Sequence, residues 1–192
     1  TESLRRRVKV FIAKHFFANK YEYRDEWLNL IETIETTSGE NHYQMATQIM
    51  MSKVDASRGA IIKKVSNQHY QLQYSHGLEL SEKIEEHLLE VGLFCQQQGW
   101  IVDVNEFEDT PAIYPNLTLD PVLCQTQKIQ IIVPIFIGKA FYGLFILADE
   151  HKIKQLNWED RDLLFAVSKQ LGNFISLYEA TDKLSESKQF DA

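Results

Sequence analysis

Two cysteines, Cys95 and Cys124, are the residues of this chain best suited to act as nucleophiles or redox groups. Such chemistry needs a thiolate of low pKa and, for a redox cycle, a second thiol within reach. The two have neither a disulfide-framework spacing nor a metal-ligand spacing, which favours a reducing, cytoplasmic setting. Cys95 falls on an apolar helical stripe and is predicted to be a core thiol, whereas Cys124 ends a loop that could line a pocket.

The six histidines raise the question of a metal or haem site. His69, His76 and His87 lie on different predicted elements, and none is repeated four residues on, as the members of a helical metal-binding pair are. We therefore predict structural or surface histidines and expect no metal.

Residues 103–126 are irregular and acidic, and they hold three of the four prolines. A structureless stretch of this length is usually a lid, a binding loop or a disordered insert. Aromatic and apolar residues near it could form a small-molecule pocket, the default kind of ligand site. The candidate lining residues are Tyr74, Trp100, Phe107, Tyr114, Cys124, Ile132, Pro134 and Phe145. The same side chains could instead fill the core of a domain without a ligand, and the sequence leaves both readings open.

The elements that would position these residues follow from the spacing of the apolar side chains. Helical spacing predicts helices over 42–54, from Ser81 to Gly99, and from Asn157 to about residue 188. Alternation and apolar runs predict strands at 58–65, 69–75, 100–102, 128–137 and 140–149. Further helices are expected over residues 1–15 and 25–36. This order predicts an antiparallel sheet with helices on both faces.

The composition is that of a packed globular protein, with 44% hydrophobic and 24% charged residues. This excludes a disordered chain, and the net charge of −7 argues against general nucleic-acid binding. No apolar run approaches the length of a membrane span. Residues 1–24 are strongly basic, in contrast to the acidic remainder. They form either a solvated helix face or a juxtamembrane segment that follows a span in a longer parent protein.

Two segments near the C-terminus resemble parts of GAF domains. Val133-Pro134-Ile135 with Phe141-Tyr142-Gly143-Leu144-Phe145-Ile146-Leu147 is similar to the last hairpin of that family, and Trp158-Glu159-Asp160 to the start of its final helix. The resemblance covers about residues 40–180. It implies an α+β GAF fold: an antiparallel five- to six-stranded sheet, helices on both faces and a long C-terminal helix.

The stretch from Arg6 to Leu28 resembles the linker of membrane sensor histidine kinases, most closely those of PEP-CTERM/exopolysaccharide systems. This resemblance implies a juxtamembrane-type linker at 1–38, a sensory GAF domain at 39–180, and at 181–192 the start of a signalling helix toward a dimerisation domain. The parent would be an ATP-binding kinase at the bacterial inner membrane, with the chain on its cytoplasmic side. Its partners would be the kinase core and a response regulator.

The chain itself is predicted to be non-catalytic and to need no cofactor, and the small-molecule ligand, if there is one, is not identified. One alternative is a GAF-fold enzyme of the free methionine sulfoxide reductase type that uses Cys124. Another is the input domain of a transcription activator. The sequence lacks the motifs that bilin attachment requires. Residues 105–109 resemble the cyclic-nucleotide signature only superficially. Axial haem ligation, known in some GAF sensors, has no motif here.

The last helix carries a heptad seam, which predicts assembly. The seam residues are Leu164, Val167, Leu171, Phe174 and Tyr178. A second apolar stripe, through Leu163, Gln170, Leu177 and Leu184, lies beside it. One stripe can cover the sheet, and the other then needs a partner. We predict a parallel homodimer with the first and last helices in a bundle. The alternative is that the two terminal helices of one chain pack on each other.

Overall fold

The structure, a computed structural model, describes residue 32 and residues 41–190. By its contacts the chain divides into a unit of residues 1–40 and a second unit, Asn41–Ala192. The helix predicted over residues 1–15, the basic segment and, apart from Glu32, the helix predicted over 25–36 lie outside the described residues.

Five antiparallel strands form one sheet in the order β2-β1-β5-β4-β3. Their bounds are β1 Arg58–Ser66, β2 His69–His76, β3 Val102–Asp103, β4 Ile129–Ile137 and β5 Ala140–Ala148. Both predicted hairpins are confirmed: Asn67 and Gln68 join β1 to β2, and Gly138 and Lys139 join β4 to β5. Gly138 has a φ of 60°, in the left-handed region where a glycine is favoured.

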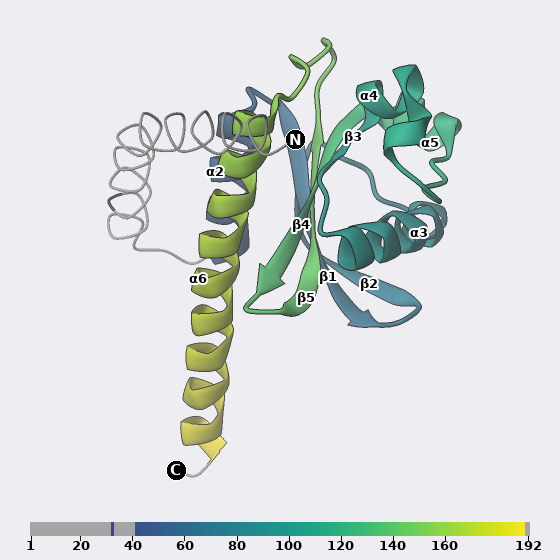
Figure 1. The fold of residues 1–192 in the computed structure, drawn as a ribbon. Helices are drawn as coiled ribbons and strands as arrows, with labels where there is room; N and C mark the ends of the chain where they lie inside the picture. The colour runs from purple at the N-terminus through teal and green to yellow at the C-terminus, as the bar shows by residue number, and fades with distance from the viewer. Residues whose placement is uncertain (1–31, 33–40, 191–192) are drawn as a thin grey trace, which may run out of the picture. The chain divides into compact units, whose positions relative to one another are not determined.

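Helices cover both faces of the sheet, as predicted (Figure 1). One face carries α2 and α6 and is called the α6 face; the other carries α3, α4 and α5 and is called the α3 face. The helix bounds are α2 His42–Lys53, α3 Glu82–Gln98, α4 Val104–Asp109, α5 Pro121–Gln127 and α6 Trp158–Phe190, with a short 3-10 turn, η1, at Pro111–Ile113.

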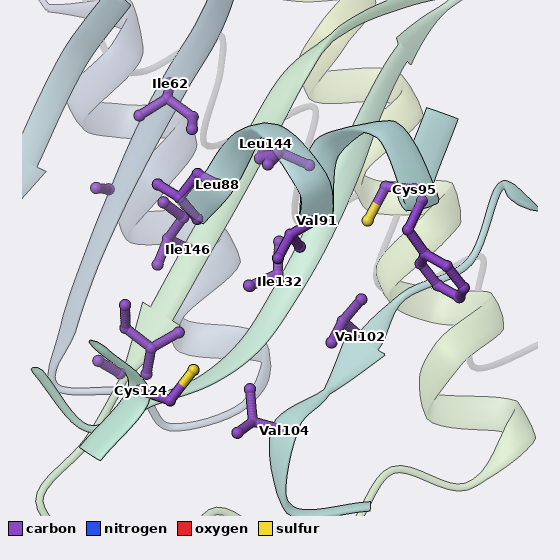
Figure 2. Packing of buried hydrophobic residues seen from close by; sticks show 14 of the residues in the cluster. Ile62, Leu88, Val91, Cys95, Val102, Val104, Cys124, Ile132, Leu144 and Ile146 are labelled. Atoms are coloured by element: carbon purple, nitrogen blue, oxygen red, sulfur yellow. The ribbon is translucent and has the colours of Figure 1, made fainter. Parts of the chain in front are cut away.

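Side chains that alternate along the central strands build a separate apolar layer on each face. On the α3 face, Ile62, Leu144 and Ile146 meet Leu88 and Val91 of α3 in one buried cluster (Figure 2). The alternate positions on the same strands face α2 and α6. Ile61, Val133 and Phe145 are paired neighbours there, and all three are fully buried. The central strands are therefore covered on both sides.

The segment 103–126 is not irregular, which corrects the sequence prediction. It contains the end of β3 and then α4, η1 and α5. Asp103 begins α4 because its Oδ1 accepts a hydrogen bond of 3.3 Å from the Glu106 N–H. The helices have six and seven residues, so they show too few turns for an apolar period to be recognised.

Helix α6 has 33 residues and confirms the long C-terminal helix. Asn157 precedes it, and its Oδ1 accepts from the Asp160 N–H at 2.8 Å, while the Asn157 N–H donates to Asp160 Oδ2 at 3.0 Å. This reciprocal pair satisfies two backbone donors at the start of the helix. Glu159 and Asp160 also place negative charge at the positive end of the helix dipole.

Candidate functional site

The residues predicted to line a pocket divide between the two faces of the sheet. Tyr114, Cys124 and Ile132 belong to the buried cluster on the α3 face, and Phe107 packs against it. Tyr114 is only 1% exposed, and its ring lies 5.9 Å, between centroids, from each of the Phe94 and Phe107 rings. These side chains are packed in the core of the chain. Pro134 is also buried and is paired with Leu144, a member of the same cluster.

Tyr74 and Phe145 lie on the α6 face. Each is paired with Ile61, whose neighbours in β1, Ala60 and Ile62, belong to the α3-face cluster. A bulge between the pairs of Ile61 and Ile62 moves Tyr74 away from the face that Tyr70 occupies. The structure therefore does not bring Tyr74 and Phe145 together with the other candidates.

Trp100 is 42% exposed, and the guanidinium of Arg161 lies 5.0 Å from the centroid of its ring. That distance is within the range of a cation–π contact. Arg161, in the first turn of α6, also reaches into the segment 103–126. It donates to the Ile101 carbonyl at 2.6 Å, to Glu106 Oε1 at 2.8 Å and to the Tyr114 hydroxyl at 2.8 Å. This Arg161 network ties α6 to α4 and to the turn after η1.

The two cysteines do not form a redox pair in the structure. Both are free and buried, and Figure 2 shows them at opposite ends of the cluster, with other side chains of the cluster between them. Burial raises the pKa of the Cys124 thiol to about 11, and the charges of Glu108 and Asp120 add to the effect. Burial alone raises the pKa of Cys95 to about 12. A nucleophilic cysteine needs the opposite shift, so this geometry argues against the reductase alternative.

Three of the five predicted dimer residues are core residues of the chain itself. Leu164, Val167 and Leu171 are at most 4% exposed, and α6 packs along β4. They would have to leave the sheet before they could contact a second copy, so the assignment of these three to a dimer interface is corrected. Phe174 and Tyr178 contact His42 at the start of α2, with the His42 and Tyr178 rings stacked at 3.5 Å between centroids.

A polar cluster holds α6 to the sheet one turn after Ile175, the last buried apolar residue among the α6 side chains that the structure describes. The carboxylate of Glu179 accepts hydrogen bonds from the Tyr43 and Tyr142 hydroxyls, both at 2.7 Å, and from Lys63 Nζ at 3.0 Å. These three donors come from α2, β5 and β1. Their four residues, Tyr43, Lys63, Tyr142 and Glu179, are called the Glu179 cluster below.

Opposing effects act on the pKa of Glu179. Burial raises it, but the hydrogen bonds from the two tyrosines and the hydrogen bond and charge of Lys63 outweigh burial, so its pKa lies below the usual 4.5. Burial, together with the neighbouring carboxylate, raises the pKa values of Tyr43 and Tyr142. Glu179 is therefore ionised and the tyrosines are neutral donors at physiological pH.

The Glu179 cluster is not among the sites predicted from the sequence. One signal was present: Glu179 stands four residues after Ile175, so the helical period places a carboxylate on the inward stripe. Its partners could not be found in this way. Tyr142 lies on the α6 face because it is the extra residue of a bulge, where β4 pairs Ile135 with Gly143 and Phe136 with Phe141.

A groove of about 560 Å³ lies between the outer side of α3 and the β1–β2 hairpin. None of the predicted pocket residues lines it. Its lining residues are Lys64, Asn67, Tyr70, Leu89, Glu90, Leu93, Gln96 and Gln97. Its volume falls within the range of small-molecule sites, roughly 300–1,000 Å³.

Within residues 41–190, no three His, Cys, Asp or Glu side chains are grouped closely enough to hold a metal ion. None of the helices in the described part of the chain combines the length and the apolar character needed to cross a membrane.

No protein-family model matches the sequence, and no curated protein matches it either. Solved structures do resemble the fold. A GAF domain from Synechocystis in its photoproduct state is 13% identical, with a TM-score of 0.54 over 74% of this chain and 96% of that one. The GAF domain of a phosphoenolpyruvate-protein phosphotransferase from Coxiella burnetii is 12% identical, with a TM-score of 0.54 over 79% and 92%.

The GAF domain of the corresponding Acinetobacter phosphotransferase is 18% identical, with a TM-score of 0.50 over 77% of this chain and 90% of that one. The chain therefore has the GAF fold, as its sequence resemblance implied: a five-stranded antiparallel sheet, helices on both faces and a long C-terminal helix. At these identities the likeness concerns the fold alone.

Proposed function

We propose that this chain is a sensory GAF domain that delivers its signal through helix α6. The observation that carries the proposal is that the first half of α6 packs on the sheet, whereas its second half extends beyond the sheet. From Leu164 to Ile175 its inward residues are buried on the sheet, and after Ile175 the Glu179 cluster ties the helix to the strands. Beyond it the helix continues to Phe190, past the end of the sheet (Figure 1). At 1.5 Å per residue this adds about 16 Å of helix.

The mechanism is a shift between two arrangements of α6 on the sheet. Apolar packing at Leu164, Val167 and Leu171 holds the first half in place, whereas the Glu179 cluster depends on donors from three other elements. A small displacement of β1 or β5 separates Lys63 or Tyr142 from the carboxylate. The projecting half of α6 then loses its anchor while the first half stays bound.

We infer that the projecting helix pairs with a second copy of the chain. Gln170 and Leu177, seven positions apart, are exposed on α6, and the half-buried Leu163 occupies the same position of the preceding heptad. Leu177 is 67% exposed, the largest exposure among the large apolar side chains of the described residues. This outward stripe replaces the inward seam as the proposed interface of a parallel homodimer. The predicted contribution of the first helix lies outside the described residues.

The context we propose for this domain is a sensor histidine kinase. The support is the resemblance of the stretch from Arg6 to Leu28 to kinase linkers, together with a long output helix suited to a dimeric kinase core. In that context the chain lies on the cytoplasmic side of an inner-membrane protein, and a response regulator acts downstream. The narrower assignment, to PEP-CTERM/exopolysaccharide systems, rests on the sequence resemblance alone.

Analytical ultracentrifugation tests the dimer. The unsubstituted chain should sediment as a dimer at tens of micromolar, and Leu177→Glu should convert it into a species of about 22 kDa. The matched control is Lys183→Glu, an exposed change on the same helix that should leave the dimer intact. A monomer at all concentrations for the unsubstituted chain would overturn the homodimer.

Autophosphorylation of the protein that contains this chain tests the signalling role. Glu179→Gln removes the charge that Lys63 pairs with, and we expect it to change the basal rate severalfold. Asp182→Asn removes the same charge from an exposed position one turn later and should leave the rate unchanged. Equal rates for the unsubstituted protein and both variants would contradict transmission through the Glu179 cluster.

A further inference from the structure

The groove between α3 and the β1–β2 hairpin holds two charged groups that are not neutralised within the described part of the chain. Lys64 Nζ donates to the neutral Gln96 Oε1 at 2.8 Å and lies 5.7 Å from the centroid of the Phe141 ring. No carboxylate of the described residues pairs with it. Glu90, on α3, also lines the groove, and no ion pair joins it to a side chain that the structure describes. The groove thus presents an ammonium and a carboxylate, neither of which is paired with an opposite charge among the described side chains.

Between these charges the groove has an apolar surface. Leu89 and Leu93 are four residues apart on α3, so they form one apolar strip along its outer side. Leu93 is 53% exposed and lines the groove, so its apolar side chain is accessible there. Tyr70 closes the inner end: Gly92 lets its hydroxyl lie against α3, where a Cβ on residue 92 would come within 1.9 Å of the Tyr70 oxygen. The amides of Asn67, Gln96 and Gln97 complete the rim.

We propose that this groove binds a small zwitterion of the apolar amino-acid class. The ligand's carboxylate pairs with Lys64, its ammonium pairs with Glu90, and its aliphatic or aromatic side chain covers Leu89 and Leu93. The volume of about 560 Å³ admits a molecule of that size. A pure anion would face the Glu90 carboxylate, and a pure cation would face the Lys64 ammonium. Only a molecule that carries both charges satisfies both walls.

The inference deepens the proposed function by naming its input, and it rests on that function for its coupling to α6. Lys63 and Lys64 are adjacent on β1, so their side chains point to opposite faces of the sheet. Lys64 lines the groove, and Lys63 donates to Glu179. A ligand that draws Lys64 toward its carboxylate moves the strand that holds Lys63, and in this way occupancy of the groove reaches the Glu179 cluster.

Calorimetric titration of the whole chain with matched probes tests the ligand class. The probes are L-leucine, 4-methylpentanoate, which lacks the ammonium, and 3-methylbutylamine, which lacks the carboxylate, with L-phenylalanine and L-methionine as further amino acids. We expect at least one of the amino acids to bind. Each one-charge analogue should bind at least tenfold more weakly than leucine, because it leaves one charged wall unpaired. Binding of 4-methylpentanoate as tight as that of leucine, or no binding of any amino acid at millimolar concentration, would overturn the proposal.

Variants of the lining residues test whether the ligand binds in the groove. Lys64→Gln and Glu90→Gln should each weaken amino-acid binding at least tenfold, while the exposed Lys139→Gln should bind normally. Circular dichroism and melting temperatures confirm that all three fold. Unchanged affinity in both groove variants would show that the ligand binds elsewhere and would overturn the assignment.

The coupling is measured separately by hydrogen exchange of the amides of residues 176–190. Ligand addition should change their exchange, and Lys63→Gln should abolish that change while the ligand still binds, because Lys63 lies on the other face of the sheet and does not line the groove. If no amino acid binds but Glu179→Gln still alters autophosphorylation, this inference fails and the proposed function stands. If amino acids bind but neither exchange nor autophosphorylation responds, the proposed function fails.

Discussion

The two faces of the sheet hold their helices by different means. On the α3 face, an apolar cluster continues through α3, α4 and α5, and the polar Arg161 network lies at its edge. On the α6 face, the apolar layer ends at Ile175, and the next inward position is occupied by the carboxylate of Glu179. Apolar burial is non-directional and tolerates small shifts, whereas hydrogen bonds are lost over a fraction of an ångström. We therefore expect the helices of the α3 face to stay bound to the sheet, and the end of α6 to separate from it more readily.

The networks also differ in what they join. Arg161 connects α6 to the segment 103–126, at the beginning of the helix. Glu179 connects α6 to β1, β5 and α2, near the point where the helix leaves the domain. The first network secures the domain, and the second is placed where a change affects only the projecting half of α6. The substitutions below test this difference between the two faces.

The largest effect is expected for removal of a core side chain from each face. Phe145→Ala on the α6 face should lower the free energy of unfolding by about 3–5 kcal/mol. Leu144→Ala, its neighbour on the α3 face, should lower it by about 2–5 kcal/mol. Urea unfolding measures both. If either costs less than about 1 kcal/mol, that face is not a packed core.

Arg161→Met should cost about 3 kcal/mol of stability, because it leaves Glu106 and the Ile101 carbonyl without their partner in a largely buried place. The control Lys169→Met, at an exposed position of the same helix, should change stability by less than about 0.5 kcal/mol. Hydrogen exchange should show the loss concentrated in residues 103–117. Loss confined to the projecting half of α6 would instead show that Arg161 and Glu179 do not act at separate places.

Glu179→Gln should cost about 1–2 kcal/mol, since the amide oxygen still accepts from a tyrosine but the pairing with Lys63 is lost. The depressed pKa of Glu179 gives this stabilisation a pH dependence. It is fully present above the unfolded pKa of about 4.5 and is lost as the pH falls through the lower, folded value. Stability curves of the two proteins should therefore converge below pH 4. A constant difference down to pH 3 would contradict the ionised cluster.

The smallest effect on stability, and a test of the enzyme alternative, concerns Cys124. With its pKa raised to about 11, the thiol should react with iodoacetamide at pH 8 far more slowly in the folded chain than in urea. We expect no turnover of free methionine sulfoxide by the unsubstituted chain, and therefore no difference from Cys124→Ser in that assay. Rapid alkylation of native Cys124, or turnover of free methionine sulfoxide that depends on this residue, would restore the reductase interpretation.

The predictions from sequence were accurate where one short-range pattern decides the structure and inaccurate where distant residues do. The β1–β2 and β4–β5 hairpins and the helix after Asn157 were foreseen, because alternation, turn residues and a capping side chain act within a few residues. The segment 103–126 was mistaken for a loop. Its short helices are stabilised by Tyr114 packing between Phe94 and Phe107 and by Arg161, which lies far away in the sequence.

The fold class, the order of the five strands and the three longer helices, and the two apolar stripes of α6 are all predictable from the sequence. Tertiary structure decided which stripe faces the sheet, and Leu164, Val167 and Leu171 proved to be core residues. Tertiary structure also decided which residues come together in each candidate site. Bulges at Tyr74 and Tyr142 changed which face these residues occupy, and Lys64 and Glu90 line one groove only because α3 packs beside the β1–β2 hairpin. Periodicity indicates which side of its own helix or strand a residue lies on. A site depends instead on how helices and strands pack together, and that packing is set by contacts between residues far apart in the chain.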